Sequence, residues 1–137
     1  MKFSVLFRNA ELNGGVAYVG ASPILKIRTG NAPTNMADAD SGTVLATMTL
    51  PSTWMAAASS GAAALAGTWH DASADATGDA GHFRIYLANG TTQFCQGSVG
   101  KTGDEATKEL ILAQATVGIV AGQEVAVASF GLTAGTA

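Results

Sequence analysis

Alternating apolar and polar residues dominate the chain from residue 24 onward, and a period of two is typical of β-strands. The pattern is clear over Ile24–Thr29, where Leu25 and Ile27 share one face. Lys26 and Arg28 share the other face, which we expect to point outward. The first strand of the domain is therefore predicted here.

Six further segments have strand patterns: residues 42–50, 63–69, 82–87, 93–99, 109–113 and 124–132. Asn89-Gly90 predicts a two-residue hairpin turn with positive φ at Gly90. Gly97 indicates a bulge or a close backbone approach in the return strand. In the last segment the apolar residues change parity, which predicts a bulge near Ala128-Ser129.

Helix signals are scarce. Residues 8–13 predict one or two helical turns, ended by Gly14-Gly15 as a C-cap. The Ala-rich segment 55–66 has helix propensity, but Ser59-Ser60-Gly61 interrupts it and no stripe of period 3.6 appears. We interpret that segment as a loop followed by a strand.

About seven strands separated by Gly, Pro and Asn turns predict an all-β domain, a sandwich or a barrel. We expect an N-terminal arm with a short helix over residues 1–20 and a β-domain over residues 21–137. The predicted core consists of Trp69, Phe83, Ile85, Val125, Val127 and Phe130.

Composition changes this picture in one respect. Only 12% of the 137 residues are charged, the net charge is -3, and Ala and Gly supply 27 and 17 residues. A surface of Ala, Gly, Ser and Thr favours contact with other protein, although an ordinary β-domain with a Thr/Ser-rich exterior has the same composition. Nucleic acid is not an expected partner, because the chain has no basic stripe.

The sequence predicts neither a membrane-spanning helix nor an intrachain disulfide. Residues 41–70 carry no charge, but Pro51 and the polar residues of 59–61 divide them, so a spanning helix is not predicted. The apolar run after Lys2 is too short for a signal peptide. Cys95 is the only cysteine, which excludes an intrachain disulfide and fits an intracellular assembly environment.

No catalytic, cofactor or metal site is predicted. The potential ligands Asp71, Asp75, Asp79, His70 and His82 do not have calcium-loop spacing, and we interpret them as loop and strand-edge residues. Ser98 lacks a nucleophile motif, and the Gly-Lys-Thr at 100–102 lacks the rest of a phosphate loop. Sugar binding stays open as an alternative, through ring stacking on Trp54, Trp69, Tyr18 or Tyr86.

Several short motifs resemble those of small virion structural proteins of tailed bacteriophages. They occur in this order: Asn9-Ala10-x-Leu12, the strand ending in Thr29-Gly30-x-x-Pro33, Gly42-x-x-Leu45-Ala46, residues 76–85 (ATGDAGHFRI), residues 96–100 (QGSVG), and Ala121-Gly122-x-x-Val125. The resemblance covers residues 8–132. The chain departs from it at residues 101–109, which are longer and more charged, and at residues 15–18, which replace a helical continuation.

The resemblance implies a capsid cement (decoration) protein with a single antiparallel, jelly-roll-like β-sandwich of about 7–8 strands. Its partners would be the major capsid protein and copies of itself, as a dimer or trimer, on the capsid exterior after synthesis in the host cytoplasm. There are two alternatives. One is a different virion part, a tail or head–tail joining subunit, and the other is a carbohydrate-binding β-sandwich. Four of the seven basic residues fall in the N-terminal fifth, against the one acidic residue Glu11, which predicts a basic contact surface there, although ordinary solubilising charges on an edge strand give the same pattern. The candidate contact residues are Lys2, Arg8, Lys26, Arg28, Trp54 and Met55.

Overall fold

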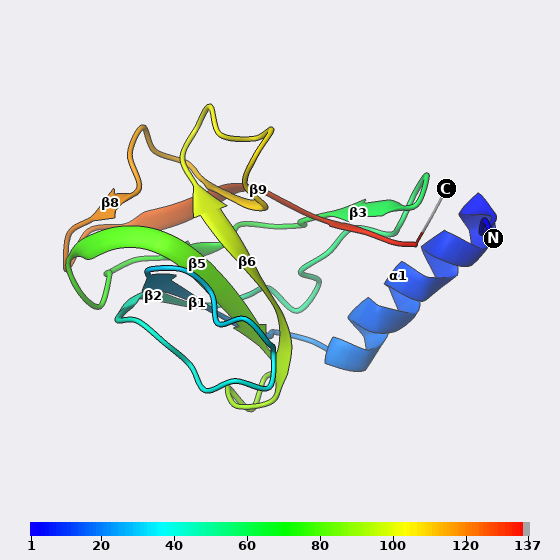
Figure 1. The fold of residues 1–137 in the computed structure, drawn as a ribbon, viewed down its shortest axis with the longest axis horizontal. Helices are drawn as coiled ribbons and strands as arrows, with labels where there is room; N and C mark the ends of the chain where they lie inside the picture. The colour runs from blue at the N-terminus through cyan, green and yellow to red at the C-terminus, as the bar shows by residue number, and fades with distance from the viewer. Residues whose placement is uncertain (136–137) are drawn as a thin grey trace.

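A computed structural model describes residues 1–135 of the chain (Figure 1). One helix, α1 (Val5–Val19), precedes nine strands. The strands are β1 (Ile24–Thr29), β2 (Val44–Thr49), β3 (Ala62–Ala64), β4 (His70–Asp71), β5 (Gly78–Tyr86), β6 (Gln93–Gly100), β7 (Leu110–Leu112), β8 (Gly118–Ile119) and β9 (Val125–Thr133). The mainly β prediction is confirmed.

The strands form one strongly curled sheet in the order β2-β1-β5-β6-β7-β9-β3, with β4 added to β9 and β8 to β5 (Figure 1). All pairs are antiparallel except β6 and β7, which run parallel through Val99↔Leu110 and Gly100↔Ile111. The sheet is therefore mixed and resembles half a barrel. A single antiparallel sandwich is not what the strand pairing shows.

The concave side of the sheet holds an aromatic core. Trp69 and Phe130 have ring centroids 5.2 Å apart, and Phe83 meets Phe130 edge-on at 5.6 Å. The six predicted core residues are all buried, which confirms that prediction. The parity change of β9 is also confirmed as a bulge, because Ile111 pairs with Ser129 but Leu112 pairs with Val127.

Helix α1 is longer than predicted. Ser4 caps its start by accepting a hydrogen bond from the Phe7 N–H, and Gly20, at φ 81°, ends it. Gly14 and Gly15 lie inside the helix and are not its C-cap. Each glycine costs about 1 kcal/mol relative to Ala, and we attribute the continuation to burial of Val19 in the core beyond them.

The β5–β6 hairpin differs from the prediction in its loop. Gly90 has φ 74° as expected, but Leu87 and Thr92 close the loop through a backbone hydrogen bond of 2.8 Å, so the connection has four residues. The Asn89 side chain accepts the N–H groups of Thr91 and Thr92. Gly97 pairs in regular register with Phe83, so no bulge lies there; it is a close approach, since a Cβ would lie 2.9 Å from the Phe83 ring.

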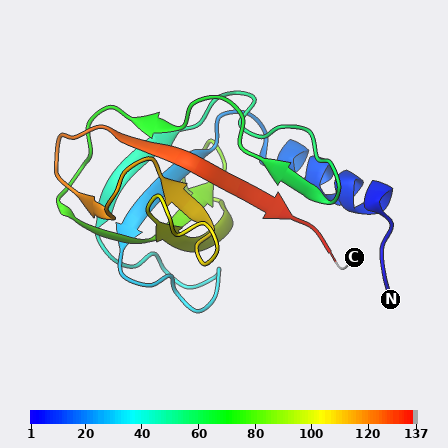
Figure 2. The same cartoon turned by 90° about the horizontal axis from the view of Figure 1, so that it is seen from above.

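The arm, residues 1–20, protrudes from the body, residues 21–135. Figures 1 and 2 show α1 extending to one side of the curled sheet, with β3 and the end of β9 running beside it. Phe3 and Gly135 lie side by side at the tip, because a Cβ at Gly135 would lie 3.3 Å from the Phe3 ring. The protein therefore has a compact body and a projecting arm.

Candidate functional site

The six sequence-predicted contact residues do not form one surface. Trp54 and Met55 are 1% and 4% exposed and belong to the core, which corrects their assignment to a contact surface. Trp54 instead anchors the base of the arm, because its indole N–H donates to the Gly20 carbonyl at 3.0 Å. Lys2 is exposed before α1, and Arg8 is half-buried on it.

Lys26 and Arg28 lie in the body, on β1. Arg28 is buried and pairs with Asp40 at 3.1 Å, so the expectation of an outward Arg28 is wrong. Lys26 is half-buried and places its ammonium 5.3 Å from the centre of the Tyr86 ring. The burial of Arg28 follows from a loop that covers this face of the sheet, because Asp40 of that loop pairs with it.

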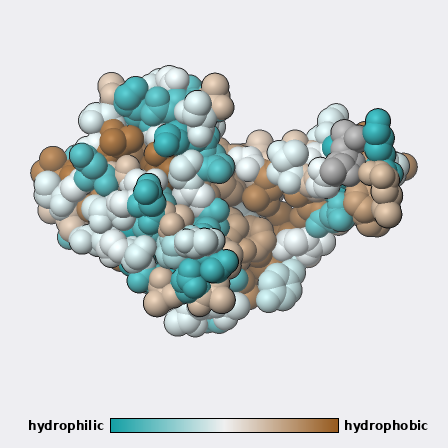
Figure 3. Space-filling model, in the orientation of Figure 1, coloured by the Kyte–Doolittle hydropathy of each residue, from teal (hydrophilic) through white to brown (hydrophobic). Residues whose placement is uncertain are grey.

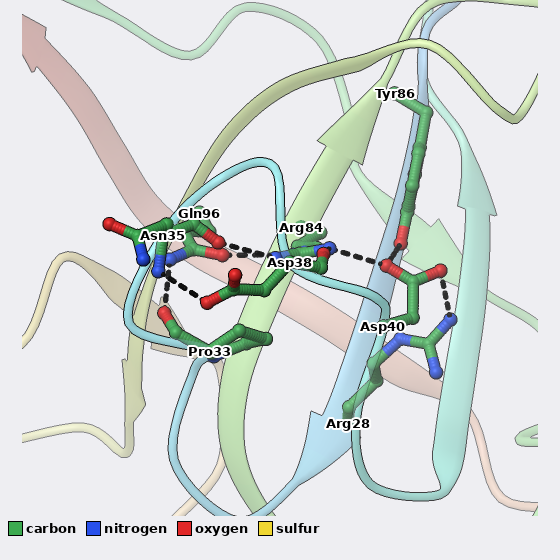
Figure 4. A network of polar contacts seen from close by, with 8 residues as sticks. All are labelled: Arg28, Pro33, Asn35, Asp38, Asp40, Arg84, Tyr86 and Gln96. Carbon is green, nitrogen blue, oxygen red and sulfur yellow. Dashed lines mark hydrogen bonds and ion pairs between the residues drawn. The ribbon is translucent and has the colours of Figure 1, made fainter.

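Residues 30–43, here called the cover loop, lie over the polar face of β1, β5 and β6 (Figure 4). The centre of this contact is Arg84 of β5, whose side chain is fully buried. Its guanidinium donates to Gln96 Oε1 (2.8 Å), to the carbonyls of Asp38 (2.9 Å) and Asn35 (3.2 Å), and to Asp40 Oδ1 (2.7 Å). One arginine therefore fixes three points of the loop.

Asp40 connects this arginine to its neighbours. Its carboxylate accepts hydrogen bonds from Arg84, from Arg28 and, at 2.8 Å, from the Tyr86 hydroxyl. Burial alone would raise the pKa of Asp40, but the bonds from Tyr86 and Arg84 and the charge of Arg28 outweigh it and lower the pKa. Burial and the bond to Asp40 raise the pKa of Tyr86.

Two further contacts close the cover loop. The Gln96 amide donates to the Pro33 carbonyl at 2.6 Å, and His82 Nδ1 lies 2.9 Å from the Gly30 carbonyl. His82 is fully buried in an inner strand, so its interpretation as a strand-edge residue is wrong. The alternation of β5 places His82 and Arg84 opposite the apolar core, but it carries no signal that a loop covers them.

The acidic residues Asp71 and Asp75 have structural contacts of their own, and Asp79 lies on β5, paired with Gly118 of β8. Asp71 accepts the backbone N–H of Thr47 at 3.0 Å, and Asp75 accepts the Thr47 hydroxyl at 2.8 Å. The Asp75 N–H also donates to the Leu45 carbonyl at 2.8 Å. These bonds occupy the open edge of β2, which would otherwise be available to pair with another strand.

Among residues 1–135 there is no pocket, and no group of three or more His, Cys, Asp or Glu side chains that could hold a metal. Burial raises the pKa of the Cys95 thiol to about 12. Sugar stacking needs exposed aromatic rings, and only one of the four candidate rings is exposed. Trp54, Trp69 and Tyr86 are buried, whereas Tyr18 is 69% exposed.

Exposed apolar surface is concentrated on the arm. Seven large apolar side chains of the described residues are exposed, and all except Val120 lie within the first 18 residues: Met1, Phe3, Val5, Leu6, Phe7 and Tyr18. Leu6 is 81% exposed. In Figure 3 the arm extends from the body, and apolar surface lines the concavity between them. Soluble proteins rarely leave such a group uncovered unless it binds something.

Specific contacts hold the inner side of the arm. The Asn9 side chain accepts the Gly61 N–H at 2.8 Å, and the Asn13 side chain accepts the Ala58 N–H at 2.9 Å. Gly61, at φ 77°, also leaves room for the guanidinium of Arg8, with which a Cβ would collide. The arm is therefore positioned on the body and is not a free tail.

Arm and body differ in charge. The arm has two basic residues, Lys2 and Arg8, against Glu11, and is net +1. Residues 21–137 have five Lys and Arg against nine Asp and Glu, and are net −4. The arm therefore combines exposed apolar side chains with a charge opposite to that of the body.

Comparison with protein-family models, with curated proteins and with solved structures finds no match to this chain. No helix among the described residues has the length and apolar character needed to cross a membrane. The projecting arm, with its exposed apolar side chains, is the candidate functional site.

Proposed function

We propose that this protein is a structural subunit of a tailed-bacteriophage virion, a capsid cement protein that binds the outer capsid and bridges capsomers. The motif resemblance over residues 8–132 supports this function. In this proposal the curled sheet is a variant of the jelly-roll-like antiparallel sandwich that the resemblance implies. The protein acts without catalysis or cofactor.

The observation that carries the proposal is the apolar arm. Six exposed large apolar residues on a segment that protrudes from the body indicate an assembly element rather than a substrate site. A cement protein needs such an element, since it acts through many weak contacts repeated by symmetry. The major capsid protein and other copies of this chain are the proposed partners.

A tail or head–tail joining subunit would use the same kind of arm and is separated by copy number in the particle. A cement protein is present in hundreds of copies, whereas a joining protein is present in about a dozen. The carbohydrate-binding alternative is less well supported, because three of its four candidate rings are buried.

The test is co-sedimentation of the protein with undecorated capsids of the phage that carries it. The full chain should bind. A variant lacking residues 1–9 loses the contacts of Arg8 and Asn9 with Gly61, so its helix should loosen while its body stays folded, and it should lose attachment. Binding should weaken only modestly in high salt, because apolar contact is not screened. Val120→Glu, which changes the exposed apolar residue outside the arm, is the control and should bind like the parent.

Full occupancy by the truncated chain would refute the arm as the attachment element. Absence of binding by the intact, folded chain would refute the cement function itself.

A further inference from the structure

One face of α1 points away from the body. Successive helical residues are about 100° apart, so Leu12, Val16 and Val19 share the face that packs on the body. The opposite, exposed face consists of Leu6, Ala10, Gly14 and Ala17, flanked by Phe7 and Tyr18. Glu11 is the only charged residue near it. A helix that is apolar on both faces is typically covered on both.

The side chains of this outward face change in size along the helix. Ala10 and Gly14 are small and central, whereas Leu6 and Tyr18 are large and lie towards the two ends. If a second α1 crosses in the opposite direction about the level of residue 12, small residues meet at the crossing. Leu6 of each copy then lies against Tyr18 of the other copy. Small residues at a crossing allow the helix axes to approach closely.

Charge favours the same arrangement. The last turn of α1 has no basic residue, although its carbonyl groups carry partial negative charge. In an antiparallel pair, the N-terminal end of each α1, which carries partial positive charge, lies next to that end of the other helix. An arm of net charge +1 then lies next to a body of net charge −4. The two bodies then lie at opposite ends of the helix pair.

We propose that the outward face of α1 binds α1 of a second copy, forming an antiparallel, two-fold symmetric dimer. The contact is isologous, since the same face serves in both copies. The dimer requires no capsid, so it can be tested independently of the proposed function. Phe3 and Val5 are exposed and lie outside this face, so on a capsid the dimer would offer two copies of the N-terminal segment on one unit and so increase avidity.

The primary experiment is sedimentation equilibrium of the full chain from about 1 to about 200 µM. We expect a monomer–dimer equilibrium. Leu6→Glu should raise the dimer Kd by more than about tenfold, because it brings charge into an apolar contact. Leu6 is 81% exposed, so this variant should fold normally. Val120→Glu is the matched control and should leave the Kd unchanged.

Gly14→Gln separates dimerisation from folding. Nothing lies within 4 Å of a Cβ at Gly14, and Gln has the higher helix propensity, so the isolated chain should become slightly more stable. The larger side chain at the crossing should nevertheless weaken the dimer. Opposite signs for the two effects are expected only if a second helix crosses at this residue.

Orientation is tested by crosslinking in a Cys95→Ala background. A mixture of Leu6→Cys and Tyr18→Cys chains should give crosslinked heterodimers with a short bifunctional thiol reagent, and Leu6→Cys alone should give few. The proposal is overturned by a monomer throughout, by a trimer, by a dimer insensitive to both helix variants, or by equally efficient crosslinking of Leu6→Cys alone. Binding of a monomer to phosphatidylcholine–phosphatidylglycerol vesicles would also overturn it.

Discussion

The cover loop and the arm both lie against the curled sheet, but they are held in opposite ways. The cover loop directs its polar contacts inward, where Arg84 and Asp40 join it to β1 and β5. The arm packs through Leu12 and Val19 and leaves Leu6 and Tyr18 exposed. The cover loop therefore completes the polar surface of the body, whereas the arm adds an exposed apolar surface.

This difference indicates where function lies. A network with two arginines resembles an anion-binding site. Its Arg84, however, is fully buried, and its N–H groups donate to acceptors within the chain. Buried polar groups must be satisfied, and here the chain itself satisfies most of them. The arm has the reverse property, because its exposed apolar side chains gain free energy only when something covers them.

The largest expected loss of stability comes from a substitution that removes the contacts of the cover loop. Arg84→Leu should lower the free energy of unfolding by about 3–5 kcal/mol, because Asp40 and two backbone carbonyls lose their buried partner. Urea unfolding measures this loss. Lys2→Leu removes the same charge from the arm and should stay within about 0.5 kcal/mol of the parent. Similar values for both variants would contradict the contrast between the two regions.

Asp40→Asn should have a smaller effect, about 1–3 kcal/mol at neutral pH. The lower part of that range is expected, since 35% of the Asp40 side chain is exposed. The pKa of Asp40 is lowered in the folded chain, so its contribution is complete above the ordinary value of 3.8 and disappears as the pH falls through the lowered one.

Unfolding measured from about pH 6 down to about pH 3 should therefore show a steeper loss of stability in the parent than in Asp40→Asn. Other carboxylates with lowered pKa, such as Glu109, affect both proteins equally. Parallel pH profiles would show that the carboxylate of Asp40 does not stabilise the cover loop.

Asn9→Ala should have the smallest effect and should act on the arm alone. It removes the hydrogen bond to the Gly61 N–H, worth about 0.5–1.5 kcal/mol. Hydrogen exchange should accelerate in α1 while β5 and β6 stay protected. Asn31→Ala, at an exposed position of the cover loop, is the control and should leave the exchange of α1 unchanged. Equal acceleration in the body would mean that the arm and the body unfold together.

Residue patterns predicted more of the body than of the arm. Period-two alternation located β1 and the second half of β5, and the Asn89-Gly90 turn located β6 as the return strand. The parity change of β9 predicted its bulge. These signals arise from neighbouring residues. The helix extent was wrong, since Gly14-Gly15 is a local stop signal that distant packing of Val19 overrides. The assignment of Trp54 to a contact surface was also wrong because of a distant contact. The residues around Trp54 do not show that its indole packs in the core and donates to the Gly20 carbonyl.

Composition and residue pattern are enough to show that this protein is mainly β, that six particular residues belong to its core, and that charge is scarce. These properties follow from composition and from side-chain alternation along single strands. Three features appear only in the folded chain: β6 and β7 run parallel, residues 30–43 bury Arg84, and α1 protrudes with apolar residues exposed. Those features depend on which distant segments meet, and a pattern along one segment does not specify its partner.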